Sequence, residues 1–231
     1  MKTALRWLGR AALLLLGLLF LIQLWYLGWV VLYKWVDPRT TSFMDRELAL
    51  LQEKNPKAQL KHQWVPYDRI SRHLKRAVIT AEDAKFNEHE GVDWDAIGKA
   101  YEVNLKRGKK AKGGSTITQQ LAKNLFLSPD KSYLRKGQEL VITFMIEAVW
   151  DKRRILEVYL NSVEWGVGVF GAEAAARHYY GTSAANLGPE QSARLAGMLP
   201  RPKFFDRNRG SAYLAGRTQA ILRYINHADV P

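Results

Sequence analysis

The run LVITFMIEAV at residues 140–149 points to the fold class, because its side chains are apolar on nearly every side of a helix. A surface helix keeps a polar face, whereas a helix that is apolar all round is buried among other elements. We therefore expect a helix at the centre of the domain with further helices packed around it. The fold class predicted from this run is mainly α.

Helical patterns lie on both sides of that central run. Apolar residues recur at helical spacing from Ile70 to Ala81 and from Ile97 to Leu105. Asp93, Ser115 and the pair Ser128-Pro129 are typical of helix starts. Turns containing Gly or Pro separate further helices, which fit residues 152–161, 171–180, 189–199 and 211–226.

The N-terminal stretch AALLLLGLLFLIQLWYLGWVVLY, residues 11–33, carries no charge and one strongly polar side chain, Gln23. A helix of that length rises roughly 35 Å, enough to cross a hydrocarbon core of about 30 Å. Aromatic residues gather at its C-terminal end, as they do at a membrane interface. A cleaved signal peptide is the alternative, but no small-x-small cleavage site follows. We expect a retained transmembrane anchor.

Flanking charges predict the orientation of this anchor. Lys2, Arg6 and Arg10 precede it, whereas the cations after it are mixed with acids. The positive-inside rule then places residues 1–10 in the cytoplasm. The domain is expected on the periplasmic or extracellular side of the cell (inner or cytoplasmic) membrane, as a single-pass protein. Residues 34–66 are expected to form a polar juxtamembrane connector with a short helix at 42–54, which leaves 67–231 for the domain.

The composition limits the kind of partner. The chain has 231 residues, a formal net charge of +13 and no cysteine. Its charge favours nucleic acid, anionic lipid or a phosphorylated substrate. An exported domain rarely meets nucleic acid and no binding signature for it is present, so no nucleic-acid partner is expected. The absence of cysteine excludes a thiolate nucleophile, a Cys-based zinc site and disulfides. The stretch KRGKKAKGG at 106–114 predicts a mobile basic loop, with an ordinary solvated turn as the alternative.

The first candidate motif is EDAKFNEHEGVD, residues 82–93, which closes an amphipathic helix. A carboxylate such as Glu82 or Asp83 can act as a general base in a partly desolvated cleft. Taken alone, such acids are more often solvated, and a histidine such as His89 is more often structural. The chemistry of this motif is open on composition alone.

Two further motifs are rich in donors and cations. In GGSTITQQLAKN, residues 113–124, glycines lead into a helix start whose free amides favour an anion. Gln119 and Gln120 share a face with Lys123 and can donate to phosphate oxygens, although a capped helix with a polar face is equally plausible. GxxxxGK[ST] is absent, so this is not a nucleotide-binding loop. In RKGQE, Arg135 and Glu139 are four residues apart, which is also typical of a simple surface ion pair.

Together with KRRILEVYLNSVEWGVGVFGAEAAARHYYG at 152–181, these motifs closely resemble the peptidoglycan glycosyltransferase (transglycosylase) family over about residues 64–202. One N-terminal span and no transpeptidase domain resemble its monofunctional members. The resemblance implies a lysozyme-like fold whose smaller lobe partly enters the bilayer. It implies an enzyme that polymerises lipid II, with lipid II, the growing glycan strand, the membrane and cell-wall synthesis proteins as partners.

The resemblance also implies roles for individual residues. Glu82 would be the general base that deprotonates the 4-hydroxyl of the acceptor GlcNAc, as that oxygen attacks the MurNAc anomeric carbon with inversion. The leaving pyrophosphate needs charge neutralisation more than a proton. The cations at family positions that contact it would be Lys123, Lys131 and Arg135, with Ser115, Gln120 and Lys136 as supporting groups.

Glu139 matches the family's second important carboxylate. It would either order the neighbouring cations or hold a Mg²⁺ or Mn²⁺ ion shared with the pyrophosphate. No cofactor is required by the sequence, because no protein-only metal cage is visible. Two other readings remain. A lysozyme-like hydrolase or lytic transglycosylase would need a proton donor for a poor leaving group, which the lysine-rich motifs argue against. A non-catalytic binding protein would not need both Glu82 and Glu139.

Overall fold

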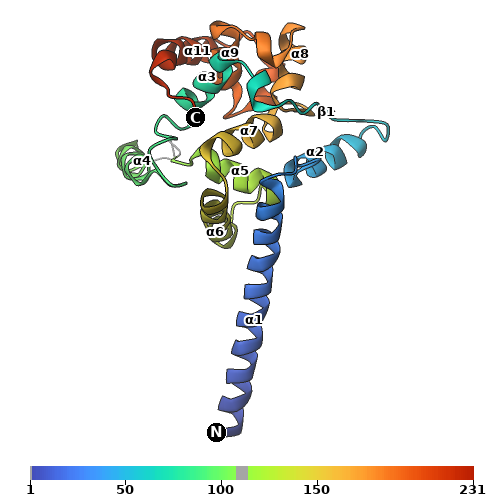
Figure 1. Cartoon of the computed structure of the whole chain (residues 1–231), viewed down its shortest axis with the longest axis vertical. Coiled ribbons are helices and arrows are strands. Elements are labelled where there is room, and N and C mark those ends of the chain that lie inside the picture. Colours follow the sequence, from blue (N-terminus) through green and yellow to red (C-terminus); the bar gives the residue numbers. More distant parts are fainter. Residues whose placement is uncertain (1, 108–113) are drawn as a thin grey trace. The chain divides into compact units, whose positions relative to one another are not determined.

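The protein is mainly helical, as the sequence predicts (Figure 1). The computed structural model describes residues 2–107 and 114–231. It divides into two compact units, one ending at Asp37 and the other spanning Pro38–Pro231. The basic loop expected at 106–114 falls mostly on residues 108–113, which lie outside the described residues.

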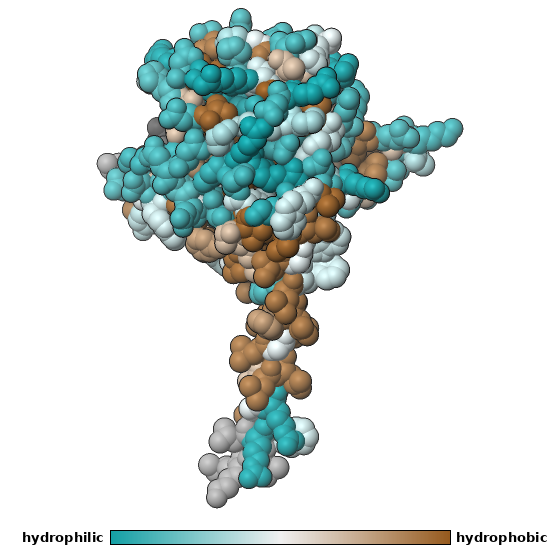
Figure 2. Space-filling view, in the orientation of Figure 1, coloured by the Kyte–Doolittle hydropathy of each residue, from teal (hydrophilic) through white to brown (hydrophobic). Residues whose placement is uncertain are grey.

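The first unit is the helix α1 (Lys2–Tyr33). Within the described part of the chain, it is the one helix long and apolar enough to cross a membrane, with a mean hydropathy of 2.1 over its best window between Arg6 and Tyr33. Figure 2 shows hydrophobic side chains along it. Trp25 and Trp29 meet edge to face near its C-terminal end, with ring centroids 5.9 Å apart. Such an exposed apolar helix is compatible with a single-pass anchor.

The second unit holds the remaining helices. They are α2 (Ser42–Gln52), α3 (Arg72–Glu82), α4 (Trp94–Arg107), α5 (Ile117–Phe126), α6 (Tyr133–Val149), α7 (Lys152–Ser162), α8 (Ala172–Tyr180), α9 (Pro189–Met198), α10 (Pro202–Arg207) and α11 (Ala212–Tyr224), with 3₁₀ turns η1 (Tyr67–Arg69), η2 (Ala184–Asn186) and η3 (Ile225–His227). The four ranges expected after residue 150 match α7, α8, α9 and α11 to within two residues at each end. The short helix α10 was not predicted, because six residues carry too little periodicity.

Two groups of helices form the core of this unit. α3, α9 and α11 pack against one another, and α5 packs against both α6 and α7 (Figure 1). Trp165, Tyr159 and Phe86 are the largest fully buried side chains. The two groups are joined at the end of α3, where Glu82 and Asp83 accept hydrogen bonds from α5.

A small sheet, which the sequence did not predict, joins the start of this unit to its middle. β3 (Val169–Phe170) pairs in parallel with β1 (Lys61–His62) and antiparallel with β2 (Glu164–Gly166). Strands of two or three residues leave no alternation that a sequence pattern can detect. β1 and α2 both lie in the stretch expected to be a connector, and they are part of the compact unit.

The side chain of Asn161 shows why this stretch is held. Its amide oxygen accepts from the Val65 backbone N–H and its amide nitrogen donates to the Val65 carbonyl oxygen, both at 2.9 Å. Asn161 thus mimics a strand partner for buried Val65. The segment before α3 is consequently fastened to α7.

Two of the three expected helix starts were wrong. Asp93 does cap α4, accepting from Ala96 N–H at 2.8 Å. Thr116 rather than Ser115 caps α5, because Thr116 and Gln119 form a reciprocal capping box. Ser132 rather than Ser128-Pro129 caps α6, accepting from Arg135 N–H at 3.1 Å.

The central run of the sequence is buried on one side only. Ile142 and Ile146 are fully buried, whereas Val141 and Phe144 are 41% and 47% exposed. The prediction of a helix buried all round is therefore wrong, because α6 packs through one face against α5 and α7 and leaves an apolar face uncovered. Leu134 at the start of α6 is also exposed. Exposed apolar surface of this kind is typical of contact with a partner or a membrane.

Candidate active site

A cleft of about 530 Å³ lies along α5 and the start of α6. Among the residues that line it are Glu139 and all six residues to which the resemblance assigns substrate binding: Ser115, Gln120, Lys123, Lys131, Arg135 and Lys136. These groups lie on two helices and on the segment between them. Four cations and one carboxylate in one cleft favour a ligand with several negative charges.

Glu139 is buried between two of these cations. Its Oε2 accepts from Arg135 Nη1 at 2.5 Å, and its Oε1 is paired with the Lys136 ammonium. Arg135 also donates through Nε to the backbone carbonyl of Asp130, at 2.5 Å. The Glu139 side chain is only 4% exposed, so this is more than the surface ion pair that spacing alone suggests. Glu139 is therefore the shared ion-pair partner of two cations that line the cleft.

A metal cage made by the protein does not fit this arrangement. In the parts of the chain that the structure describes, no three His, Asp or Glu side chains lie close enough to hold an ion together. Both Glu139 oxygens already contact cations. A divalent ion at Glu139 would have to displace Arg135 or Lys136.

Lys123 is a half-buried cation of the cleft that has no hydrogen-bonded partner among the described residues. Within the described ranges, its ammonium makes no hydrogen bond or ion pair, and it lies 5.4 Å from the centroid of the Phe43 ring on α2. Burial lowers the pKa of Lys123, and the nearby Arg135 and Lys136 lower it further while Glu139 opposes them. A half-buried cation without a counter-ion is stabilised by any anion that enters the cleft.

Glu82 is the last residue of α3 and is held from two directions. Its Oε2 accepts from Gln120 Nε2 at 2.9 Å, and its Oε1 accepts from Arg217 Nη2 at 3.2 Å. Burial raises the pKa of Glu82, and the contacts with Gln120 and Arg217 oppose that rise. Because Gln120 also lines the cleft, it connects Glu82 to the cationic cleft. A buried carboxylate with a raised pKa is suited to proton abstraction.

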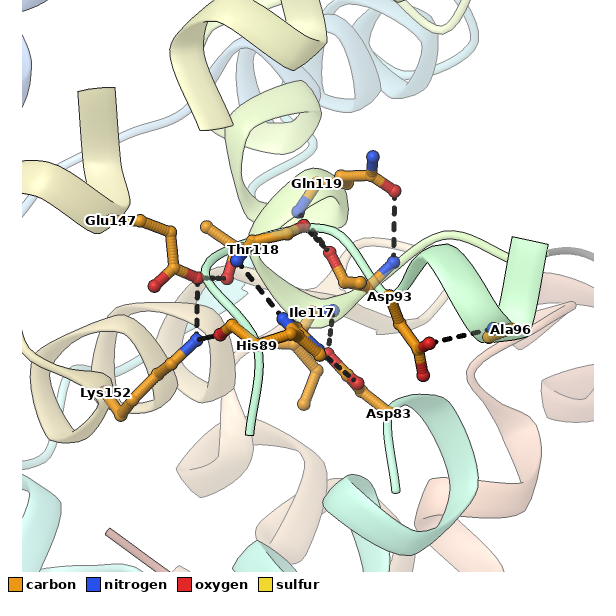
Figure 3. Close-up of polar contacts among 11 residues, drawn as sticks. Asp83, His89, Asp93, Ala96, Ile117, Thr118, Gln119, Glu147 and Lys152 are labelled. Atoms are coloured by element: carbon orange, nitrogen blue, oxygen red, sulfur yellow. Dashed lines mark hydrogen bonds and ion pairs between the residues drawn. The ribbon is translucent and has the colours of Figure 1, made fainter. Parts of the chain in front are cut away.

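The residue after Glu82 fixes where α3 ends (Figure 3). Asp83 accepts through Oδ2 from the Ile117 backbone N–H at 3.0 Å, and its Oδ1 lies 2.8 Å from His89 Nε2. His89 Nδ1 accepts from Gly91 N–H at 3.2 Å, so Nε2 carries the proton donated to Asp83. Asp83 is therefore buried and His89 is largely covered, and both side chains are hydrogen-bonded within the protein rather than solvated.

A second set of polar contacts supports the same turn from α6 and α7 (Figure 3). Glu147 Oε1 accepts from Thr118 Oγ1 at 2.5 Å and from Lys152 Nζ at 2.9 Å. Lys152 Nζ also donates to the carbonyl oxygen of His89 at 2.6 Å. These bonds tie α5, α6 and the loop after Asp83 together.

The sequence predicted no role for several contributors to the site. Tyr159 on α7 donates through its hydroxyl to Gln120 Oε1 at 2.9 Å. Arg217 lies in the tail where no motif is distinctive, and Phe43 lies in the stretch expected to be a connector. Gln119 was expected to present donors beside Lys123, but its side chain instead accepts from Thr116 N–H in the capping box.

The transglycosylase family model matches residues 48–226. The chain belongs to this family. The transglycosylase match includes α2 from Leu48 onward and reaches beyond α11, so it covers the cleft, Glu82 and Arg217.

Similar proteins support the same assignment over the whole chain. A biosynthetic peptidoglycan transglycosylase of Janthinobacterium sp. (strain Marseille) is 65% identical over 94% of this chain and 92% of its own length. One of Dechloromonas aromatica (strain RCB) is 62% identical over the full length of both chains. The expected peptidoglycan glycosyltransferase activity is thereby confirmed, and this transglycosylase is an enzyme of peptidoglycan synthesis.

Proposed function

We propose that the enzyme polymerises lipid II into glycan strands by inverting transfer, and that it has no transpeptidase activity. The observation that carries this proposal is Lys123, a half-buried cation without a counter-ion in a cleft that contains three more cations. A pyrophosphate supplies the negative charge that Lys123 lacks as a partner. A hydrolase acting on neutral glycan has no such need, because its leaving group requires a proton donor instead.

On the donor side, the cleft binds the undecaprenyl pyrophosphate of the growing strand. Lys123, Lys131, Arg135 and Lys136 neutralise the charge that develops as the bond between the anomeric carbon and the phosphate oxygen breaks. The pyrophosphate leaves with the bonding electron pair. Ser115 and Gln120 supply neutral hydrogen bonds beside it.

On the acceptor side, Glu82 removes the proton from the 4-hydroxyl of GlcNAc in lipid II. The freed oxygen attacks the MurNAc anomeric carbon from the face opposite the pyrophosphate, so the α linkage becomes a β-1,4 bond. The proton remains on Glu82 until it passes to solvent. Burial suits this role, because a carboxylate with a raised pKa is a stronger base than a solvated one.

Glu139 orders the donor cations in this proposal, because each of its oxygens already contacts one of them. A Mg²⁺ or Mn²⁺ ion, if it binds, would be shared with the substrate pyrophosphate rather than held by the protein alone. It would supply further neutralisation of the leaving group.

The lipid-linked substrate requires the site to work at a membrane. We propose that α1 anchors the chain with its N-terminus in the cytoplasm and the enzymatic unit on the periplasmic or extracellular side. The exposed apolar face of α6, which includes Val141 and Phe144, supports contact with lipid. We assign the basic stretch 106–114 to attraction toward anionic lipid, at about 1 kcal/mol per cation near the surface, or to entry of the acceptor. Normal membrane-bound activity after replacing its lysines with glutamine would contradict this assignment.

The test is polymerisation of purified lipid II by the detergent-solubilised enzyme, followed by gel separation of glycan strands. Wild type should make long strands that a muramidase digests. Glu82→Gln should make none and still bind lipid II, because its shape is kept and its basicity is lost. Glu88→Gln is the matched control, since Glu88 is exposed six residues further along.

Other outcomes of these assays would support a different function. If wild type leaves lipid II untouched but shortens preformed glycan, the enzyme is a hydrolase. If it is inert in both assays, it is a binding protein. Loss of lipid II binding in Glu82→Gln would argue against the base role.

A further inference from the structure

Arg217 contacts the carboxylate of Glu82 although it lies far away in the sequence. Its Nη2 lies 3.2 Å from Glu82 Oε1 and 3.4 Å from the carbonyl oxygen of Ala81. One guanidinium nitrogen therefore bridges the side chain of Glu82 and the backbone at the end of α3. This end of a helix is unfavourable for a carboxylate, because the free carbonyl groups carry partial negative charge.

Helix packing places Arg217 there. α11 packs against α9 and α3, and Gly197 on α9 lies next to the α11 side chains. A Cβ at Gly197 would come within 3.1 Å of Leu214 Cδ1 and within 3.8 Å of Arg217 Cγ. The glycine thus allows α11 to approach closely enough for Arg217 to reach Glu82.

The other groups around Glu82 do not replace this cation. Asp83, the next residue, is an acid that raises the pKa of Glu82. Gln120 on α5 and the Tyr159 hydroxyl behind it on α7 are neutral. Lys123 on α5 attracts Glu82 through space but makes no hydrogen bond to it. Among the described residues, Arg217 is the cation that touches the carboxylate.

We propose that Arg217 is a positioning residue for glycosyl transfer, whose guanidinium keeps the Glu82 carboxylate ionised and in one orientation through its contact with Oε1. The inference rests on the proposed function of Glu82 as the base. Arg217 does not take up the proton itself, because a guanidinium stays protonated throughout the working pH range. Arg217 instead sets the fraction of enzyme molecules in which Glu82 is ionised and can accept a proton.

The consequence is a specific pH dependence. Without Arg217 the buried carboxylate loses its cation, and its pKa rises further. Below that pKa, each unit of rise lowers the ionised fraction by about tenfold. Activity should therefore fall most at acidic pH and recover as the pH is raised.

The experiment uses the full-length enzyme in detergent and measures initial rates of lipid II polymerisation across pH. In Arg217→Gln, kcat should fall by on the order of tenfold below neutral pH, with little change in KM, and the acidic limb of the kcat profile should move to higher pH. Arg217→Lys should restore most of the rate, since a cation remains. Arg223→Gln, on the exposed face of the same helix, should behave as wild type.

Three results would overturn the inference. These are an unshifted acidic limb in Arg217→Gln, a loss confined to KM, or an equal loss at every pH together with a lower unfolding temperature. If Arg217→Gln does not fold, Gly197→Ala tests the same point with Arg217 retained. The added Cβ should push α11 outward and shift the acidic limb in the same direction, by less. Failure of wild type to polymerise lipid II would instead remove the proposed function itself.

Discussion

The carboxylate of Asp83 accepts a hydrogen bond from the backbone N–H of Ile117, which joins the end of α3 to the first residue of α5. Glu82 directly precedes Asp83, and Gln120 and Lys123 follow Ile117 within about two turns of α5. The buried Asp83 side chain, together with the hydrogen bond from Gln120 to Glu82, fixes the proposed base to the cationic cleft. The second Asp83 oxygen is bound by His89, so neither oxygen is free to turn away.

Asp83→Asn should lower both stability and turnover. The two donors, Ile117 N–H and His89 Nε2, face different oxygens of Asp83, so in the amide one of them meets an NH₂ group and loses its partner. The free energy of unfolding should fall by about 1–3 kcal/mol, measured by denaturant unfolding of the solubilised enzyme. Asp95→Asn, whose side chain is 69% exposed, is the control and should change stability by less than about 0.5 kcal/mol. Equal stability of the two variants would contradict the role of Asp83.

Tyr159→Phe should impair the enzyme through Gln120. The hydroxyl donates to Gln120 Oε1, and this fixes the amide so that its NH₂ group faces Glu82. Its loss leaves a buried acceptor unpaired, which costs about 1–3 kcal/mol, and it frees the amide to flip. We expect a lower kcat at unchanged KM in the lipid II assay. Tyr213→Phe, at an exposed tyrosine, should leave kcat unchanged; the same loss in both would mean that the Tyr159 contact is not used.

Lys123→Met should weaken donor engagement, because methionine keeps much of the apolar stem and removes the charge. A charge-assisted hydrogen bond contributes about 1.5–3 kcal/mol, so kcat/KM should fall by roughly tenfold to a hundredfold. The dependence of kcat/KM on salt should also become shallower. Lys54→Met, at an exposed lysine after α2, is the matched control. Wild-type kinetics in Lys123→Met would remove Lys123 from the site.

Gly91→Ala should destabilise the turn that follows Glu82 in the sequence. Gly91 has φ +86°, and an added Cβ would lie 2.6 Å from Thr143 Cγ2 on α6. Strain at such a backbone position costs about 1–3 kcal/mol, and the clash adds to it. The unfolding temperature should drop clearly, whereas Gly98→Ala in the interior of α4, with open space around it, should raise it slightly. A Gly91→Ala enzyme as stable as wild type would show that the turn relaxes easily.

Glu164 should make stability depend on pH near neutrality. Burial and the neighbouring Glu47 raise the pKa of Glu164 to about 7, against the attraction of Lys203. A raised pKa contributes stability below the ordinary value of 4.5, and this contribution is lost as the pH rises through about 7. The Gln side chain in Glu164→Gln stays neutral. The unfolding temperature of this variant should therefore rise relative to that of wild type as the pH rises across that window. Glu102→Gln, at an exposed acid, should run parallel to wild type.

The helices of this protein could be predicted well, and their packing less well. The ranges of α7, α8, α9 and α11 follow from local periodicity, which is a property of each segment alone. The burial of α6 does not, because whether Val141 and Phe144 are covered depends on which elements surround the helix. β1 pairs with β3 across about a hundred positions of sequence, and β2 and β3 are too short for a local pattern to mark them.

The sequence by itself determined the membrane-compatible helix, the mainly α class and the motif residues that line the cleft, because hydropathy, helical period and motif chemistry are carried by short stretches of chain. The tertiary structure alone decided which groups meet the proposed base. Arg217 lies 135 residues from Glu82 in the sequence, yet it touches the carboxylate because α11 packs against α3. Such contacts depend on how helices are arranged in space. The sequence around either residue therefore does not predict the contact with the other.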